Sequence, residues 1–258
     1  MTTSTTNGPQ GNPGDILNWP MLKITYRTDP AAIAALLPPG IKPGRNPHVN
    51  ITIYNFPVHA EPEYGLVINV DADYHGVEGE YGLAIGIDQE APLFICQEMW
   101  GQPKYPVDTE YYRLMDHVVA KVVHQGCTFI EFHGDVVATL PIPADHEQNE
   151  WWIKSVRGVD SSKIQYDFPP HVVRVHSKYG TAHLQELKGK LTLRESAWDP
   201  IATLLPLREQ VSARLWTPIF KDRSITLFGE LDGEAYWPFA DTISGTRWPG
   251  SSGGPKQG

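Results

Sequence analysis

The chain has 258 residues, enough for one large domain with a substantial core. Its formal net charge of −9 argues against nucleic acids and anionic membranes as partners, because both attract clustered basic residues, which are scattered here. The two cysteines are too few for a disulfide scaffold, so we expect a reduced, cytoplasmic location. The chain starts without a basic or apolar leader and has no run as long as a membrane span, so we expect no signal peptide.

Three segments are expected along the chain. Residues 1–15 are rich in Thr, Gly, Asn and Pro, and residues 249–258 are rich in Gly, Ser and Pro. These segments predict a disordered lead and a disordered tail, because they carry too little apolar area to offset the entropy cost of ordering. Residues 16–248 predict a single domain, since neither an internal repeat nor a linker interrupts them.

The first half of this domain is predicted to be mainly β, with one short helix. Alternating apolar residues predict strands, and Pro30 predicts the start of a helix that stops at Pro38. The apolar run 91–95 is interpreted as one more strand, leading into a turn. The predicted strands of this half are 21–27, 48–56, 64–74, 81–87 and 91–95.

The second half predicts short strands in a meander. Segment 116–123 fits a strand or a helix, and a hairpin is predicted around Gly134. A short helix is expected within 200–207. The predicted strands are 127–132, 135–140, 172–176, 182–186, 190–194 and 224–228.

One stretch, residues 96–105, carries the chemistry that the residues themselves indicate. Lys104 follows a rigid turn, because Pro103 has a fixed φ and Gly101 permits backbone conformations that strain other residues. If this turn faces inward, Lys104 is buried, and burial favours the neutral amine that attacks carbonyl groups. We therefore expect Lys104 at the wall of the largest internal cavity. The sequence Gly-Gln-Pro-Lys, residues 101–104, is also common in solvated surface turns.

Other groups of residues in the sequence give weaker evidence for a functional site. The ten histidines lack the spacing of a zinc site, so no metal is expected. A turn that contains His75, Glu78 and Glu80 fits acid–base chemistry, but a solvated loop is the preferred interpretation. Neither a Gly-x-Ser-x-Gly nucleophile elbow nor a phosphate-binding Gly-Lys-Ser/Thr loop is present.

Several short segments, taken in series, match one known family in order and spacing. The segments are Tyr26-Arg27-Thr28-Asp29, Leu36-Leu37-Pro38, His75 to Tyr81, Asp88-x-Glu90, Gln97-Glu98, Gly101-x-Pro103-Lys104 and Glu195-Ser-Ala-Trp198. Across roughly residues 18 to 240, the chain resembles the acetoacetate decarboxylase superfamily. The resemblance implies a β-rich fold, with antiparallel sheets closing into a barrel-like cavity, a few peripheral helices and assembly into homo-oligomers.

The resemblance also implies a mechanism. In that superfamily the lysine at the Lys104 position condenses with a ketone, and the protonated imine serves as the electron sink. Acetoacetate decarboxylase is itself the standard example of a lysine activated by an apolar pocket or a second cation. No cofactor is implied, and the partner is a small carbonyl substrate.

The chain departs from the family's pattern beside this lysine. The family has two consecutive lysines, whereas here Tyr105 follows Lys104, so one cation is missing. Gln97 replaces an arginine, and Glu98 is kept. We expect Lys104, Tyr105 and Glu98 to be catalytic, with Tyr105 supplying a phenol for proton transfer.

Further departures concern the substrate pocket. By ungapped matching, Trp19 stands where the family has an arginine that meets the substrate carboxylate, and Thr52 and Leu66 stand near its two acidic residues. These replacements predict a more apolar pocket. The expected substrate-binding residues are Trp19, Thr52, Leu66, Gln97 and Trp100.

Three functions remain open at this stage. The first is a lyase that forms an imine with a ketone or aldehyde larger and more apolar than acetoacetate, in an aldol or retro-aldol reaction, a dehydration or a decarboxylation. The second is an isomerase or cyclase that uses the apolar cavity without an imine. The third is a non-catalytic protein that binds a small molecule in that cavity.

Overall fold

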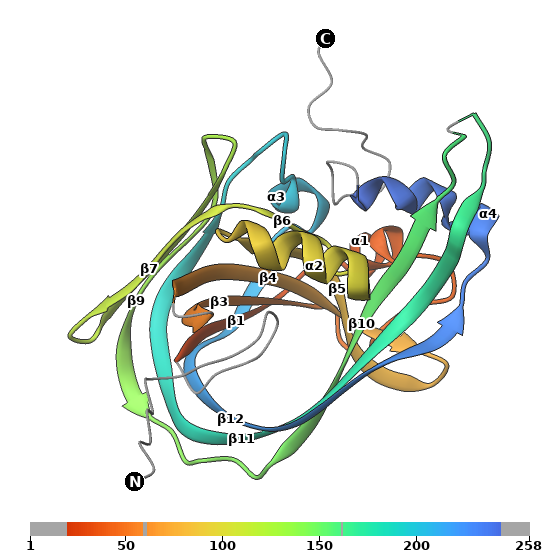
Figure 1. Ribbon diagram of the computed structural model, residues 1–258. Helices are drawn as coiled ribbons and strands as arrows, with labels where there is room; N and C mark the ends of the chain where they lie inside the picture. Colours follow the sequence, from red (N-terminus) through yellow and green to blue (C-terminus); the bar gives the residue numbers. More distant parts are fainter. Residues whose placement is uncertain (1–19, 59–60, 161, 244–258) are drawn as a thin grey trace, which may run out of the picture.

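The computed structural model describes residues 20–58, 61–160 and 162–243, which form a mostly β structure with few helices (Figure 1). The predicted fold class is therefore confirmed. The expected lead and tail, residues 1–15 and 249–258, lie outside the described residues. Among the helices within these ranges, none is long and apolar enough to cross a membrane.

Twelve strands form one sheet in the described part of the chain. The strands are β1 (Met21–Arg27), β2 (Lys42–Pro43), β3 (His48–Val58), β4 (Glu61–Tyr74), β5 (Val77–Ile87), β6 (Lys104–Pro106), β7 (Asp108–Leu114), β8 (His117–His124), β9 (Cys127–Thr139), β10 (His146–Arg157), β11 (Tyr166–Leu193) and β12 (Glu209–Glu230). The helices are α1 (Pro30–Leu36), α2 (Glu90–Trp100), α3 (Ile201–Leu204), α4 (Gly233–Tyr236) and the 3₁₀ helix η1 (Trp237–Ile243).

Part of this sheet closes into a ring. The strand order is β10-β5-β4-β3-β1-β12-β11-β9-β8-β7, and an additional pairing of β10 with β11 closes the first seven strands on themselves. Strands β9, β8 and β7 continue the sheet beyond β11, at the left of Figure 1. A closed ring leaves these seven strands without a free edge, and each of them has an inner and an outer face.

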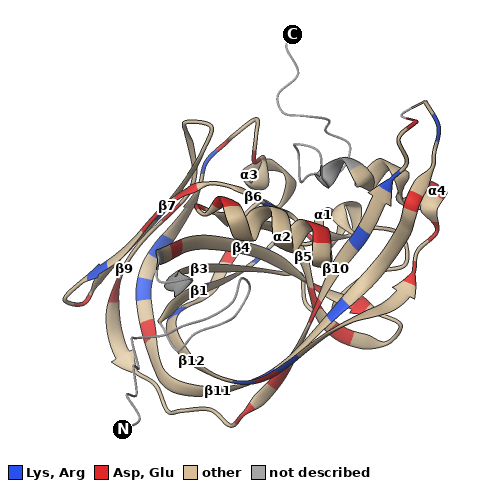
Figure 2. Cartoon of the chain, in the orientation of Figure 1, with Lys and Arg blue, Asp and Glu red and all other residues tan. Residues whose placement is uncertain are grey.

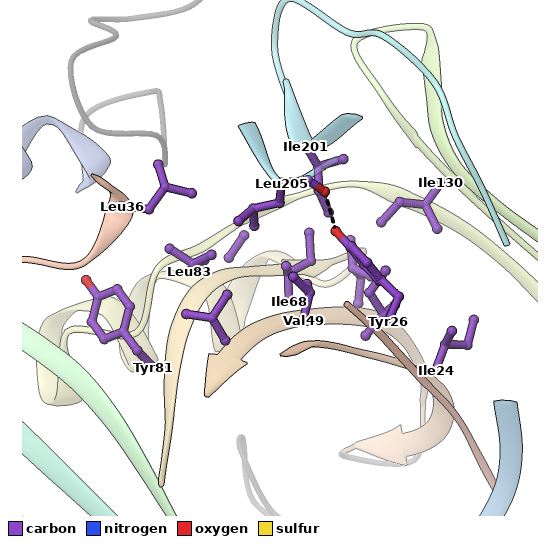
Figure 3. Close-up of a cluster of buried hydrophobic side chains, with 14 of the residues drawn as sticks. Ile24, Tyr26, Leu36, Val49, Ile68, Tyr81, Leu83, Ile130, Ile201 and Leu205 are labelled. Carbon is purple, nitrogen blue, oxygen red and sulfur yellow. Dashed lines mark hydrogen bonds between the residues drawn. The ribbon is translucent and has the colours of Figure 1, made fainter. Parts of the chain in front are cut away.

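The main hydrophobic core lies on the outer face of the ring. In β1, Leu22, Ile24 and Tyr26 alternate into this core, where the Tyr26 hydroxyl donates a hydrogen bond to the carbonyl oxygen of Leu205 at 2.9 Å (Figure 3). Side chains from β8, β9, α1 and α3 complete the core. The intervening residue Lys23 points to the other face, so the alternation of each strand separates an apolar outside from a polar inside.

The predicted meander is wrong in one respect: its short strands at 172–176, 182–186 and 190–194 fall in one long strand, β11, and 224–228 lies within a second long strand, β12. β11 runs over 28 residues, and β12 over 22. Their pairing contains bulges at Val172/Val173, Lys178/Tyr179 and Thr181/His183, which let a single strand bend around the ring. The Gly and polar residues that suggested turns therefore mark bends within a continuous strand.

The predicted hairpin around Gly134 is also wrong, because Gly134 lies inside β9. It faces Gly189 of β11 in the strand pairing. A Cβ atom on Gly134 would come within 2.9 Å of the Gly189 Cα, so the glycine serves the close approach of two strands. Segment 116–123, left open between strand and helix, falls in strand β8.

The predicted strand at 91–95 is a helix, α2. Its buried residues Leu93 and Cys96 and the half-buried Trp100 follow a helical spacing of three to four residues. Phe94 and Ile95 are apolar but exposed, so a five-residue window looked uniformly apolar and gave no period. A helix therefore precedes the lysine turn.

Candidate active site

Lys104 is the first residue of β6, which pairs in parallel with β5. The amide of Ile85 donates a hydrogen bond to the carbonyl oxygen of Pro103 at 3.0 Å, which fixes the start of β6. Lys104 faces a cavity on the inner side of the ring and is 5% exposed. Tyr105 is also buried, but it faces the outer core, because successive residues of a strand point to opposite faces.

The turn between α2 and β6 fixes the position of Lys104. Gly101 ends the helix with a positive φ of 69°, and its amide donates to the carbonyl oxygen of Gln97 at 2.9 Å. The side-chain amide of Gln97 donates back to the carbonyl oxygen of Lys104. The turn therefore ties the lysine backbone to the helix on one side and to β5 on the other.

Replacing Gly101 by alanine is expected to destabilise the protein and misplace Lys104. The added Cβ would clash with the carbonyl oxygen of Ile153 and the Cα of Lys154 in β10, and the left-handed conformation adds strain. Together these costs are expected to reach at least about 2 kcal/mol. Urea unfolding would measure the loss. Gly126 is the control, since it also has a positive φ but its added Cβ meets no atom within 4 Å.

The cavity beside Lys104 has a volume of about 110 Å³. Within the described residues, its walls come from the ring strands, β6 and the residue that precedes Pro103. The lining residues are Met21, Lys23, Thr52, Tyr54, Glu63, Val67, Asn69, Ile85, Gln102, Lys104, Gln148, Glu150, Trp152, Tyr179, Trp216 and Arg223. Figure 2 shows that both signs of charge are distributed along these strands.

The Lys104 amine lies among a thiol, a carboxyl and a phenol. It donates a hydrogen bond to the Cys96 thiol at 3.4 Å. The Tyr54 hydroxyl donates to Glu63 Oε1 at 3.0 Å, and Glu63 is 2% exposed. Burial raises the pKa of the Glu63 carboxyl, although Lys104 and the Tyr54 hydrogen bond act to lower it. Burial also raises the pKa of the Cys96 thiol.

The far side of the cavity is also charged. Lys23 donates a hydrogen bond to the Thr52 hydroxyl at 2.7 Å and lies over the ring of Trp216. Burial raises the pKa of the Glu150 carboxyl, against a hydrogen bond from Trp152. The lining thus contradicts the expected apolar pocket, because the cavity carries cations and carboxyls that the ungapped match to the family did not find.

The predicted binding residues are only partly brought together. Thr52 lines the cavity with Lys104. Leu66 is fully buried in the outer core, on the opposite face of β4, so the structure does not bring it to the lysine. Trp19 lies outside the described residues. Trp100 packs against a second hydrophobic cluster that includes Trp152, and it lines no described cavity.

The predicted catalytic Glu98 lies away from the lysine cavity. It is exposed and lines a separate groove of about 740 Å³, together with Gln97. This groove is larger than the Lys104 cavity, so the expectation that Lys104 lines the largest cavity is wrong. Lys104 is buried at a cavity wall, but the wall belongs to a smaller space.

Glu63, Tyr54 and Lys23 are the site residues that the sequence analysis missed. Strand alternation carries a signal for Glu63, because Glu63 and Val67 share one face of β4 while Leu66 takes the other. No local pattern identifies Lys23, since its partner Thr52 lies on another strand. In the described part of the chain, no group of three His, Cys, Asp or Glu side chains is placed to hold a metal ion.

The fold and the site define a class of protein: a closed ring of strands with a buried lysine at an interior cavity. The family model for acetoacetate decarboxylase matches residues 1–231, and the chain belongs to that family. No curated protein matches the chain in sequence. The predicted superfamily is thereby confirmed.

Solved structures show the same fold. The acetoacetate decarboxylase of Legionella pneumophila is 17% identical with a TM-score of 0.68, over 84% of this chain and 85% of that chain. An acetoacetate decarboxylase-like enzyme from Sphingomonas wittichii RW1 is 14% identical with a TM-score of 0.66, over 82% and 91%. The enduracididine biosynthesis enzyme MppR, in complex with pyruvate, is 16% identical with a TM-score of 0.64, over 80% and 87%. At these identities the likeness shows a shared fold alone.

Proposed function

We propose that this protein is a lyase that acts through an imine between Lys104 and the carbonyl carbon of a ketone or aldehyde. The observation that carries the proposal is the buried Lys104 amine, which reaches the interior cavity next to the buried Glu63 carboxyl. Membership of the acetoacetate decarboxylase family supports the same chemistry. No other described lysine combines this degree of burial with access to the cavity.

The proposed reaction begins when the neutral amine attacks the carbonyl carbon. Loss of water gives an imine, and its protonated form accepts the electron pair of a bond that breaks next to the former carbonyl carbon. Glu63 supplies the proton for the departing oxygen, because its raised pKa keeps the carboxyl protonated beyond the ordinary range. After it has regained a proton from solvent, it supplies the proton for the substrate carbon. Tyr54 orients Glu63 through their hydrogen bond.

The size and the lining of the cavity favour a substrate whose carbonyl end is small and polar. A volume of about 110 Å³ holds only a few carbon and oxygen atoms around the carbonyl. Lys23 forms no ion pair within the described residues, so it is a candidate to meet a polar or anionic substituent. Aldol cleavage, dehydration and decarboxylation all use the same electron sink, and the proposal covers these three.

Reductive trapping tests the proposal. The protein would be incubated with acetone, pyruvate or acetoacetate and sodium cyanoborohydride, and the mass added to each peptide measured. We expect one covalent adduct on the peptide that carries Lys104. If all carbonyl probes leave this peptide unmodified, the imine-independent isomerase or the binding protein becomes the better account.

A further inference from the structure

The 740 Å³ groove lies beside the lysine turn, between the end of α2 and the end of β10. One wall comes from the helix and the turn, the second from β10, and Trp237 closes the third side. Its volume falls within the range that is usual for small-molecule sites. The lining residues are Phe94, Gln97, Glu98, Gly101, Gln102, Pro103, Ser155, Val156, Arg157, Gly158 and Trp237.

Gln102 stands between this groove and the Lys104 cavity, since it lines both. It stands two residues before the lysine, in the turn that Gly101 begins. A molecule with its carbonyl at Lys104 has about 110 Å³ around it on the inner side. A second space of about 380 Å³ shares Lys23, Gln148 and Trp216 with that cavity, and the groove beyond Gln102 is larger than both. Of these three spaces, the groove offers the most room for a large distal part of a substrate.

Two buried polar atoms in the groove walls lack hydrogen-bond partners within the described residues. They are Gln102 Oε1 and Ser155 Oγ, and their residues are 6% and 9% exposed. A buried polar atom without a partner costs free energy, so native proteins rarely retain one without a reason. Two such atoms lining a single groove are accounted for by a ligand that supplies the missing hydrogen bonds.

The remaining lining indicates the chemistry of that ligand. Phe94, 59% exposed, and Trp237 offer aromatic surface that suits a flat ring. Glu98 and Arg157 add one charge of each sign, so the lining favours no net charge on the ligand. Gln102 Oε1 accepts hydrogen bonds and thus selects a donor, such as a hydroxyl or an amide.

We propose that the groove binds the distal part of the carbonyl substrate, an uncharged aromatic or apolar ring that carries a hydrogen-bond donor. This inference rests on the proposed function, because it assumes that the carbonyl end lies at Lys104. Gln102 then determines specificity at the junction of the two spaces, and Ser155 contributes a second polar contact from β10.

The first experiment compares a long and a short ketone. Trapping on Lys104 would be measured with 4-(4-hydroxyphenyl)butan-2-one and with acetone. We expect half-maximal trapping by the long ketone at a concentration at least tenfold lower. Val156→Trp, which fills the groove from an exposed position, should erase this advantage and leave acetone trapping unchanged. Val159→Trp is the control, since Val159 is 97% exposed and lines no described groove.

The second experiment separates binding from imine chemistry. Calorimetry would measure the affinity for the corresponding alcohol, 4-(4-hydroxyphenyl)butan-2-ol, which cannot form an imine. We expect Gln102→Leu and Ser155→Ala each to weaken binding about 5- to 10-fold. Because these atoms have no hydrogen-bond partner in the part of the chain that the structure describes, neither change should lower the melting temperature. A loss of stability in step with affinity would overturn the ligand role.

The two proposals fail in different ways. If acetone traps on Lys104 but the long ketone shows no advantage, the groove inference is overturned and the lyase proposal stands. Equal binding of the alcohol to wild type and Val156→Trp would also overturn the groove inference. If no ketone traps while the alcohol binds in a Val156-sensitive manner, the lyase proposal is overturned, and the groove stands as a ligand site without the link to Lys104.

Discussion

Replacing Lys104 by methionine is expected to abolish covalent trapping and all turnover. Methionine has a similar length and fills the same space, but it lacks the amine that forms the imine. Trapping with cyanoborohydride and peptide mass mapping would measure the loss. The melting temperature should change little, because the only side chain among the described residues to which the Lys104 amine donates a hydrogen bond is the Cys96 thiol.

Lys23→Met is the matched control for this experiment, since Lys23 lines the same cavity. Its amine donates a hydrogen bond to Thr52, and the side chain is less buried than Lys104. We expect this variant to keep the adduct on Lys104 while weakening substrates that carry an anionic group. An adduct on Lys23 that persists in Lys104→Met would move the nucleophile to Lys23 and contradict the proposal.

The elements that the sequence predicted well are those with a clear local period. The alternation in β1 and β3 and the proline at the start of α1 are local signals, and the structure agrees with them. β11 could not be predicted as one strand, because its bends are bulges set by pairing with β12 and by closure of the ring. Helix α2 was not predicted, because two exposed apolar residues, Phe94 and Ile95, mask the helical period of its buried residues.

The residues of the candidate site also differ in whether a local sequence signal predicts them. Lys104 could be predicted, since a Gly-x-Pro turn and a family resemblance both indicated one position. Glu63 and Lys23 reach the cavity from distant strands, and only the ring brings them near the lysine. An ungapped match placed Leu66 at the site, although a one-residue offset along a strand moves a side chain to the opposite face.

Replacing Glu63 by glutamine is expected to slow turnover by about 10²- to 10⁴-fold, because it removes the proposed proton donor and keeps the shape of the side chain. The glutamine oxygen can still accept the hydrogen bond from Tyr54. The wild-type rate should fall as pH rises through the raised pKa of Glu63, since the carboxyl then loses its proton. The variant should lack this dependence in a profile of kcat/KM against pH.

The stability of the Glu63→Gln variant should change in the opposite direction from its activity. The pKa of Glu63 is raised in the folded protein, so folding favours the protonated carboxyl, and its stabilising contribution is lost as pH rises through that pKa. Glutamine never ionises, so the variant should match wild type at low pH and unfold at a higher temperature than wild type near neutral pH. Thermal unfolding across this range would measure the difference. A variant that is less stable at every pH, with activity reduced only in proportion, would show that Glu63 supports the fold and that another group carries the proton.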